Sequence, residues 1–207
     1  MAHAAERNRP DVAAARDRWR DEVAPPLDPH RVVFVDETAA NTTMDRRSGY
    51  APKGEPVVGS VPHGHHKSLT FAAALRADGP TAGRVLDGPM TGERFHEYVT
   101  RVLVPTLRPG DAVVLDNLPC HKSARVRQAV EGAGCELRFL PAYSPDPNPI
   151  ELAFARLKRL LRSDGHRTVP GLMRFLDSAT RLFAAAECSN YIRHCGYGTD
   201  DATATPN

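Results

Sequence analysis

The chain has 207 residues, of which 41% are hydrophobic and 25% charged, and its formal net charge is +2. This length favours one domain with additional arms, and the hydrophobic fraction is sufficient for a proper core. The mild positive charge permits a nucleic-acid partner but does not by itself indicate one. No apolar run is long enough to span a bilayer, and the first nine residues lack a signal-peptide core. Since the four cysteines also lie at no disulfide-like spacing, we expect reduced thiols in a cytoplasmic protein.

The N-terminal segment predicts a helix without a domain of its own. Residues 11–23 are rich in alanine and arginine, with Trp19 as an expected anchor. Pro25 and Pro26 follow and end the helix. We therefore predict an N-terminal helical arm over residues 1–29.

Two continuous apolar, β-branched runs predict strands that are buried on both faces. The first is Val32–Val35, and we expect it to end at Asp36 and Glu37. The second is Ala112–Leu115, which ends at Asp116. In open α/β sheets, sites gather at the ends of such strands.

The remaining chain alternates between predicted strands and helices. We predict short strands and turns over 48–64, a strand over 68–75, helices over 91–107 and 122–131, a strand over 135–140, and helices over 149–162 and 170–186. This alternation is typical of an α/β fold in which helices cover both faces of a sheet. It predicts a main domain over 30–165, a C-terminal helical segment over 166–198 packed on it, and a disordered tail over 199–207.

A proline-rich loop leads into the best-defined predicted helix. Four prolines within residues 141–149 keep the backbone extended or turned, and Asn148 suits the N-cap position. Glu151 lies three residues later, so it is readable as the acidic half of a capping box. Helical geometry also places Lys158 and Arg162 within roughly 20° of the direction of Glu151, beside a buried stripe. A carboxylate that heads a row of cations is typical of a metal ligand beside a phosphate-binding track.

Asp36, Asp116 and Glu151 each follow or open a rigid element, as precise sites require. Carboxylates brought together repel one another, and a hard divalent cation such as Mg²⁺ relieves that repulsion. Two such ions, about 3.5–4 Å apart, activate a water on one side of a phosphodiester and stabilise the leaving oxygen on the other. Each aspartate alone is explained equally well as a residue that polarises a turn after a strand. The set of three, in this order, favours a metal site.

Three segments together resemble the catalytic motifs of DDE transposases. They are residues 33–38 (VFVDET), 114–123 (VLDNLPCHKS) and 140–158 (LPAYSPDPNPIELAFARLK). The resemblance is to the bacterial insertion-sequence branch related to mariner elements, and the 34 residues between Asp116 and Glu151 match the spacing of that branch. The similarity extends from about residue 9 to residue 197.

The resemblance implies a ribonuclease H-like fold with a mixed central sheet and helices on both faces. It implies that Asp36, Asp116 and Glu151 are catalytic ligands of Mg²⁺, with Mn²⁺ as a substitute and two ions in the site. It also implies hydrolysis of phosphodiesters at transposon ends, followed by attack of the freed 3′-hydroxyl on target DNA without a covalent protein–DNA intermediate. By the same analogy, a homodimer pairs two ends, and the protein is bacterial and nucleoid-associated.

Further residues match the family or suit contacts with DNA. Positions expected to orient the carboxylates or water are Glu37, Asn117, His121 and Asn148. For His121, a loop histidine hydrogen-bonded to backbone is an equally good explanation. Basic residues expected to contact DNA phosphates are Lys67, Lys158, Arg159 and Arg162, because such contacts need only charge and reach.

The chain departs from the family pattern in two respects. Pro147 replaces the usual leucine in the proline loop, which should stiffen the loop. Relatives also carry an N-terminal helix-turn-helix domain that reads transposon ends, and no segment of this sequence corresponds to it. We therefore expect a separately encoded or frameshift-fused helix-turn-helix half as a partner.

Two other interpretations of the function of the whole chain remain. One is a degenerate element product that binds DNA or self-associates without cutting, and the other is a different ribonuclease H-like nuclease such as a junction resolvase. Zinc at residues 63–66, or at Cys188 with His194 and Cys195, is disfavoured because neither group has paired ligand spacing.

Overall fold

The fold is described by a computed structural model that covers residues 6, 9–45, 50–56, 58 and 67–198. No helix within these residues is both long enough and apolar enough to cross a membrane. All four cysteines are free thiols.

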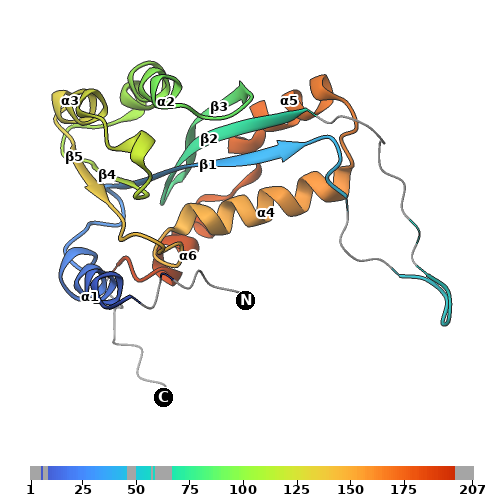
Figure 1. The fold of residues 1–207 in the computed structure, drawn as a ribbon, viewed down its shortest axis with the longest axis horizontal. Helices are drawn as coiled ribbons and strands as arrows, with labels where there is room; N and C mark the ends of the chain where they lie inside the picture. Colours follow the sequence, from blue (N-terminus) through green and yellow to red (C-terminus); the bar gives the residue numbers. More distant parts are fainter. Residues whose placement is uncertain (1–5, 7–8, 46–49, 57, 59–66, 199–207) are drawn as a thin grey trace.

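A five-stranded mixed sheet forms the centre of the molecule, in the order β3-β2-β1-β4-β5 (Figure 1). The strands are β1 (Val32–Asn41), β2 (Ser68–Arg76), β3 (Gly79–Asp87), β4 (Ala112–Leu115) and β5 (Glu136–Phe139). The central strand β1 pairs antiparallel with β2 and parallel with β4, and β4 pairs parallel with β5. The predicted mixed sheet is confirmed.

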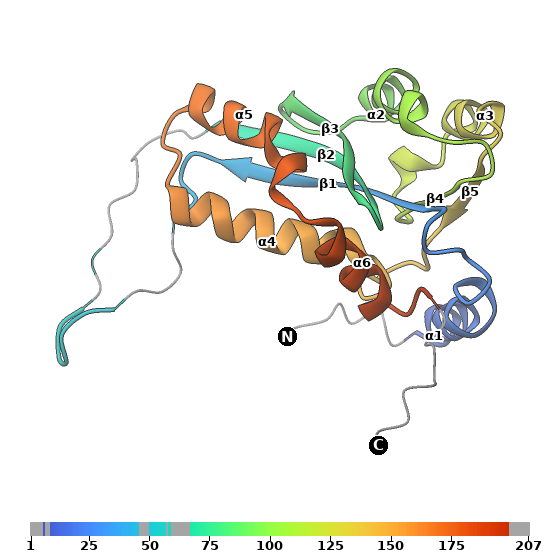
Figure 2. The same cartoon turned by 180° about the vertical axis from the view of Figure 1, so that it is seen from behind.

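Helices cover both faces of this sheet (Figures 1 and 2). The α-helices are α1 (Pro10–Arg18), α2 (Gly92–Tyr98), α3 (Ala124–Gly132), α4 (Pro149–Asp164), α5 (Val169–Asp177) and α6 (Ala185–His194). The π-helical turns η2 (Trp19–Val23) and η3 (Val99–Leu103) extend α1 and α2, and the 3₁₀ segments are η4 (Val104–Thr106), η5 (Pro119–His121) and η6 (Ala179–Leu182).

Alternate side chains of β1 belong to two separate hydrophobic clusters. Val32 and Phe34 pack in the cluster that includes buried residues of α4, α5 and α6. Val33 and Val35 pack in the cluster that includes buried residues of α2 and α3. Because successive side chains of a strand point to opposite faces, this continuous apolar run is buried on both sides, as predicted.

Helix α4 is amphipathic and has defined ends. Pro149 occupies its first turn, where the missing N–H costs no helical hydrogen bond. Phe154, Leu157 and Leu161 are buried against the sheet, and each buried side chain of this size contributes about 2 kcal/mol. The helix ends at Gly165, whose φ of 62° is left-handed and favours glycine.

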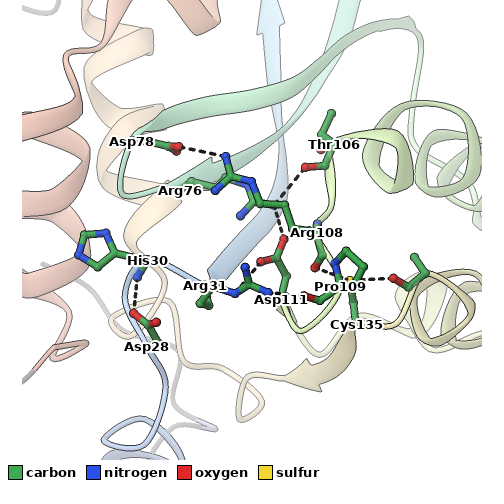
Figure 3. Close-up of polar contacts among 11 residues, drawn as sticks. Asp28, His30, Arg31, Arg76, Asp78, Thr106, Arg108, Pro109, Asp111 and Cys135 are labelled. Atoms are coloured by element: carbon green, nitrogen blue, oxygen red, sulfur yellow. Dashed lines mark hydrogen bonds and ion pairs between the residues drawn. The ribbon is translucent and has the colours of Figure 1, made fainter.

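A cluster of buried charged residues lies at the end of the sheet where β1 and β4 begin (Figure 3). Asp111 is fully buried and accepts hydrogen bonds from the Arg76 guanidinium and from the N–H of Arg108. The Nε of Arg31 lies 3.4 Å from the Asp111 carboxylate. Each charge at this position therefore faces an opposite charge.

One strand was predicted with the wrong end, and one strand was not predicted. Strand β1 does not end before Asp36 but continues to Asn41, because its second half pairs with β2. Strand β3 was missed because Gly79, Pro80 and Gly83 resemble a turn; proline is tolerated here because β3 is an edge strand. The short strands predicted over 48–64 fall largely outside the described residues, and the described residues 50–56 and 58 form no strand.

The single helix predicted over 170–186 was also wrong. The chain instead forms α5, η6 and α6, with Phe183 in an extended conformation between the last two. The hydroxyl of Ser178 donates to the carbonyl of Phe175, so it satisfies an acceptor at the end of α5 that a continuing helix would use. Apolar periodicity alone did not reveal this break.

Candidate active site

The three predicted carboxylates come from three separate elements and line one pocket of about 490 Å³. Asp36 lies in the middle of β1, Asp116 follows β4 directly, and Glu151 lies in the first turn of α4. Val35 and Leu115 are register partners on adjacent parallel strands, so the two aspartates that follow them leave the sheet side by side. Residues separated by more than a hundred positions therefore face the same pocket.

Asp36 is a deeply buried carboxyl of the pocket. It is 7% exposed, and its two oxygens accept hydrogen bonds from the N–H of Glu37 at 2.7 Å and from Nδ2 of Asn148 at 2.9 Å. Burial and the negative charge of Glu151, with a smaller contribution from Asp116, raise the pKa of Asp36 to about 8. A nearby cation would relieve this stress on the carboxylate.

Asp36 and Glu37 are consecutive, so their side chains leave β1 on opposite faces. Asp36 meets Asn148 at the start of α4, whereas the Glu37 carboxylate meets Nε2 of His121 at 3.1 Å. The other ring nitrogen of His121 bonds to Asp116. One imidazole therefore joins a carboxylate of β1 to the carboxylate that follows β4.

His121 is fully buried, with its ring centroid 4.1 Å from that of Phe95. Burial lowers the pKa of His121, but the hydrogen bonds to Asp116 and Glu37 outweigh it and raise the pKa to about 10. Both ring nitrogens face carboxylate oxygens, which accept hydrogen bonds when ionised, so this arrangement favours the protonated imidazole. Its ring bonds to carboxylates, which disagrees with the alternative of a loop histidine bonded to backbone.

Asn148 occupies the N-cap position of α4 but does not cap the helix with its side chain. That side chain turns to Asp36 instead. The N–H of Asn148 donates to the carbonyl of Pro145, so it does not bond to Glu151 as a capping box requires. The structure therefore disagrees with the capping-box interpretation of Glu151, whose side chain is exposed at the pocket.

The pocket wall includes residues that the sequence did not single out. Asn117 was expected and lies there half-buried, but the exposed apolar side chains of Leu118 and Tyr143 line the pocket too. They are 48% and 49% exposed, and Tyr143 has a φ of 53°, which is unusual for a bulky residue. The only sequence signal for Tyr143 was an aromatic residue within a proline loop.

The predicted DNA contacts divide into two groups. Lys158, Arg159 and Arg162 follow Glu151 along α4, with Arg159 exposed and the other two half-buried. Lys67 lies elsewhere, because the neighbouring Ser68 pairs with Asn41, roughly 17 Å beyond Asp36 along β1. Its Nζ forms an ion pair with Asp87 at 2.5 Å. The structure therefore places Lys158, Arg159 and Arg162 on the helix that carries Glu151, whereas Lys67 lies beside the end of β1 and is paired with Asp87.

The pocket has the donors that Mg²⁺ and Mn²⁺ prefer, since it is lined by three carboxylates and two side-chain amides. As the side chains stand, however, no three His, Cys, Asp or Glu residues among those described lie close enough together to hold a metal ion. Asp36 is held by Asn148 and Asp116 by His121. Metal binding therefore requires these carboxylates to move from the positions that Asn148 and His121 hold.

The two zinc alternatives lie in different parts of the chain. Cys188 is fully buried, and among the described residues Cys188, His194 and Cys195 do not form a group placed to hold a metal ion. Residues 63–66 lie outside the described part of the chain.

Comparison with known proteins agrees with this geometry. The profile of the DDE superfamily endonuclease family matches residues 31–172, which is more than half of the chain. No curated protein sequence matches it at a significant level.

Solved structures of Mos1 transposase have a similar fold. The Mos1 mariner paired-end complexes with Mn and with Mg give TM-scores of 0.70 and 0.68 at 20% and 21% identity, covering 89% of this chain and 57% of theirs. The catalytic domain of Mos1 mariner transposase gives a TM-score of 0.59 at 20% identity, covering 89% of this chain and 84% of that one. The chain thus spans little more than half of the Mos1 chains in the paired-end complexes. Its ribonuclease H-like sheet, its three convergent carboxylates and its match to the family profile show that the chain belongs to the DDE superfamily of endonucleases.

Proposed function

We propose that this chain is the catalytic domain of a transposase that hydrolyses phosphodiester bonds at transposon ends and transfers the freed 3′ ends to target DNA. The observation that carries the proposal is the convergence of Asp36, Asp116 and Glu151 on one pocket. The similar Mos1 structures with Mn and Mg support a divalent cation as cofactor.

In this proposal Asp36, Asp116 and Glu151 hold Mg²⁺, or Mn²⁺ in its place, in a two-ion site. Cations bound there would supply the activation of a water and the stabilisation of the leaving oxygen. Asn148 fixes the orientation of Asp36, and His121 fixes that of Asp116 through a charge-assisted hydrogen bond. Neither residue needs to touch the DNA for these roles.

The protein face beside the pocket suits a DNA backbone. Lys158, Arg159 and Arg162 run along α4 from Glu151, and none of them forms an ion pair within the described part of the chain. Their charges are therefore available to phosphates. We assign DNA contacts to these three cations, and we leave Lys67 as a separate contact for DNA further from the scissile bond.

We propose that residues 30–165 form the ribonuclease H-like domain and that residues 166–198 pack on it. Leu172, Leu176 and Ile192 of the C-terminal segment belong to the same hydrophobic cluster as Phe34 of β1, which supports this arrangement. By analogy with the paired-end complexes of Mos1, the working form is a homodimer on DNA. A helix-turn-helix half, encoded separately or joined by a frameshift, supplies recognition of the ends.

Calorimetry with Mn²⁺ tests the site without requiring end recognition. The native chain should bind Mn²⁺ saturably, and Asp116→Asn should weaken binding at least tenfold because it removes a ligand charge. Asp78→Asn is the matched control, since Asp78 is exposed in the turn between β2 and β3. Nicking of supercoiled plasmid in Mn²⁺ is the second measurement.

The outcomes separate the three readings of the chain. Binding and nicking that both fail in Asp116→Asn support the transposase. Saturable binding without nicking by the native chain, even with a helix-turn-helix half added, favours a degenerate product. Absence of Mn²⁺ binding refutes the proposed site. Selective cleavage of four-way junctions would favour a resolvase instead.

A further inference from the structure

The proline loop that precedes Glu151, residues 141–149, forms few hydrogen bonds within itself. Residues 141, 145, 147 and 149 are prolines and carry no N–H donor, and Tyr143 has a left-handed backbone conformation. The N–H of Asn148 donates within the loop to Pro145, and the hydroxyl of Ser144 donates to the carbonyl of Ala142. Other polar groups of the loop need donors from elsewhere in the molecule.

One such donor is Arg16 of the N-terminal helix α1. Its Nη1 donates to the hydroxyl oxygen of Ser144 at 3.1 Å, and its Nη2 donates to the carboxylate of Asp146 at 2.8 Å. The side chain of Arg16 is 20% exposed and that of Asp146 is 43% exposed, so the bond to Ser144 is partly buried and the bond to Asp146 lies at the surface. A planar guanidinium that bonds to two points of a loop fixes their separation.

The second donor is Tyr197, three residues after α6. Its hydroxyl donates to the carbonyl of Pro147 at 2.6 Å and accepts a hydrogen bond from Nε1 of Trp19 at 3.0 Å. The residue is 1% exposed, and its ring meets that of Phe34 edge-on with centroids 4.6 Å apart. Figures 1 and 2 both show α1 beside the chain that follows α6, at the side of the molecule where α4 begins.

The hydrogen bond of Tyr197 lies one residue from a side chain that contacts the pocket. The carbonyl that Tyr197 holds belongs to the peptide bond between Pro147 and Asn148, and Asn148 donates to Asp36. A shift of this peptide unit would move the amide that orients Asp36 and the helix turn that carries Glu151. All three bracing side chains, Arg16, Trp19 and Tyr197, lie outside the segment matched by the family profile.

We propose that Arg16 and Tyr197 are positioning residues of the active site, which set the distance between Asp36 and Glu151 by fixing the proline loop from outside. Trp19 serves this arrangement by orienting the Tyr197 hydroxyl. The proposal rests on the transposase function proposed above, because it assigns the loop a role in cleavage. The N-terminal arm is thereby part of the catalytic unit rather than a linker.

Tyr197→Phe tests the brace with minimal disturbance, because it removes only the hydroxyl and keeps the ring against Phe34. Its matched control is Tyr98→Phe, which removes a buried hydroxyl that donates to the carbonyl of Ala82 at 2.9 Å, on the opposite face of the sheet. Hydrogen exchange of the peptide over residues 142–152 should accelerate about tenfold in Tyr197→Phe and remain unchanged in the control. Arg16→Gln should accelerate the same peptide.

Nicking of supercoiled plasmid in Mn²⁺ supplies the catalytic readout. We expect kcat to fall about tenfold in Tyr197→Phe and Arg16→Gln with little change in KM for the plasmid, because orientation rather than DNA binding is impaired. Tyr98→Phe should retain kcat. Arg16→Lys should recover only part of the rate, since a single ammonium cannot reproduce the two bonds.

Unchanged exchange of the loop in Tyr197→Phe overturns the proposal, and so does faster exchange without any loss of kcat. Equal losses in Tyr197→Phe and Tyr98→Phe indicate general destabilisation and overturn it as well. If the loop responds as expected but the native chain neither binds Mn²⁺ nor nicks DNA, the proposed function fails and the positioning role falls with it. The exchange data then record a structural brace alone.

Discussion

Replacement of Asp111 by asparagine should destabilise the protein strongly although it preserves the shape of the side chain. Asp111 is fully buried and faces Arg76, whose side chain is 5% exposed (Figure 3). The N–H of Arg108 donates to the same carboxylate at 2.7 Å, and Arg31 lies close by. Asp111→Asn leaves the Arg76 guanidinium buried without its counter-charge.

The expected cost is about 3 kcal/mol, at the lower end of the range for breaking one side of a buried ion pair, because Arg76 also donates to the carbonyl of Thr106. For a chain of this length, each kcal/mol lowers the melting temperature by about 2–4 °C, so the melting temperature should fall by about 6–12 °C. Asp78→Asn is the control, since the exposed pair of Asp78 with Arg108 should contribute less than about 1 kcal/mol. Calorimetry or circular dichroism at pH 7 measures both.

The dependence on pH provides a second test of the same reasoning. Burial of Asp111 opposes its ionisation, but the hydrogen bonds from Arg76 and Arg108 and the charges of Arg76 and Arg31 hold the pKa of this carboxyl below its usual range. The unfolded chain therefore takes up the proton first, so the stabilisation is complete above the unfolded pKa of about 3.9 and is lost as the pH falls through the folded value. The difference in melting temperature between the native chain and Asp111→Asn should be constant from about pH 7 to pH 5 and narrow below about pH 4.

A fall in melting temperature of less than about 2 °C in Asp111→Asn would refute this account. So would a difference that widens on acidification. An equal effect of Asp78→Asn would show that the loss comes from surface charge rather than from the buried pair.

Three further changes have defined outcomes. Asn148→Ala removes the amide that orients Asp36, and calorimetry should show the Mn²⁺ dissociation constant rising about tenfold; an unchanged constant would exclude this role. Leu176→Ala should cost about 3 kcal/mol in urea unfolding because the side chain is fully buried, whereas Met173→Ala on the exposed side of the same helix should cost less than about 1 kcal/mol. Equal costs would contradict the assigned packing of α5. Gly165→Ala should cost about 1 kcal/mol in the same assay because alanine is strained at a φ of 62°, and a stabilised variant would contradict that reasoning.

Much of the sheet and the three carboxylates of the pocket followed from local pattern. Continuous apolar runs predicted β1 and β4, and each run was adjacent to an aspartate. The proline loop followed by an amphipathic helix placed Glu151 within the first turn of α4. These inferences succeeded because burial on both faces and helical periodicity are properties of short segments.

The features that the sequence did not reveal depend on distant partners. The extension of β1 beyond Asp36 is determined by pairing with β2. The Asn148 side chain bonds to Asp36 instead of capping its own helix, and this partner lies 112 positions away in the sequence. Likewise, nothing local to Arg16 indicates that it reaches Ser144.

The position of Asp36 and Glu37 in the central strand has a consequence for redesign of this pocket. Because the two carboxylates point to opposite faces, a slip of β1 by one residue would exchange them, and partners on both sides of the strand oppose any slip. Pairing with both neighbours thus fixes the position of Asp36, relative to which Asp116 and Glu151 must be placed. The spacing between Asp36 and Glu151 is therefore adjustable through the loop that follows β5 and through its contacts with Arg16 and Tyr197, which leave the sheet intact.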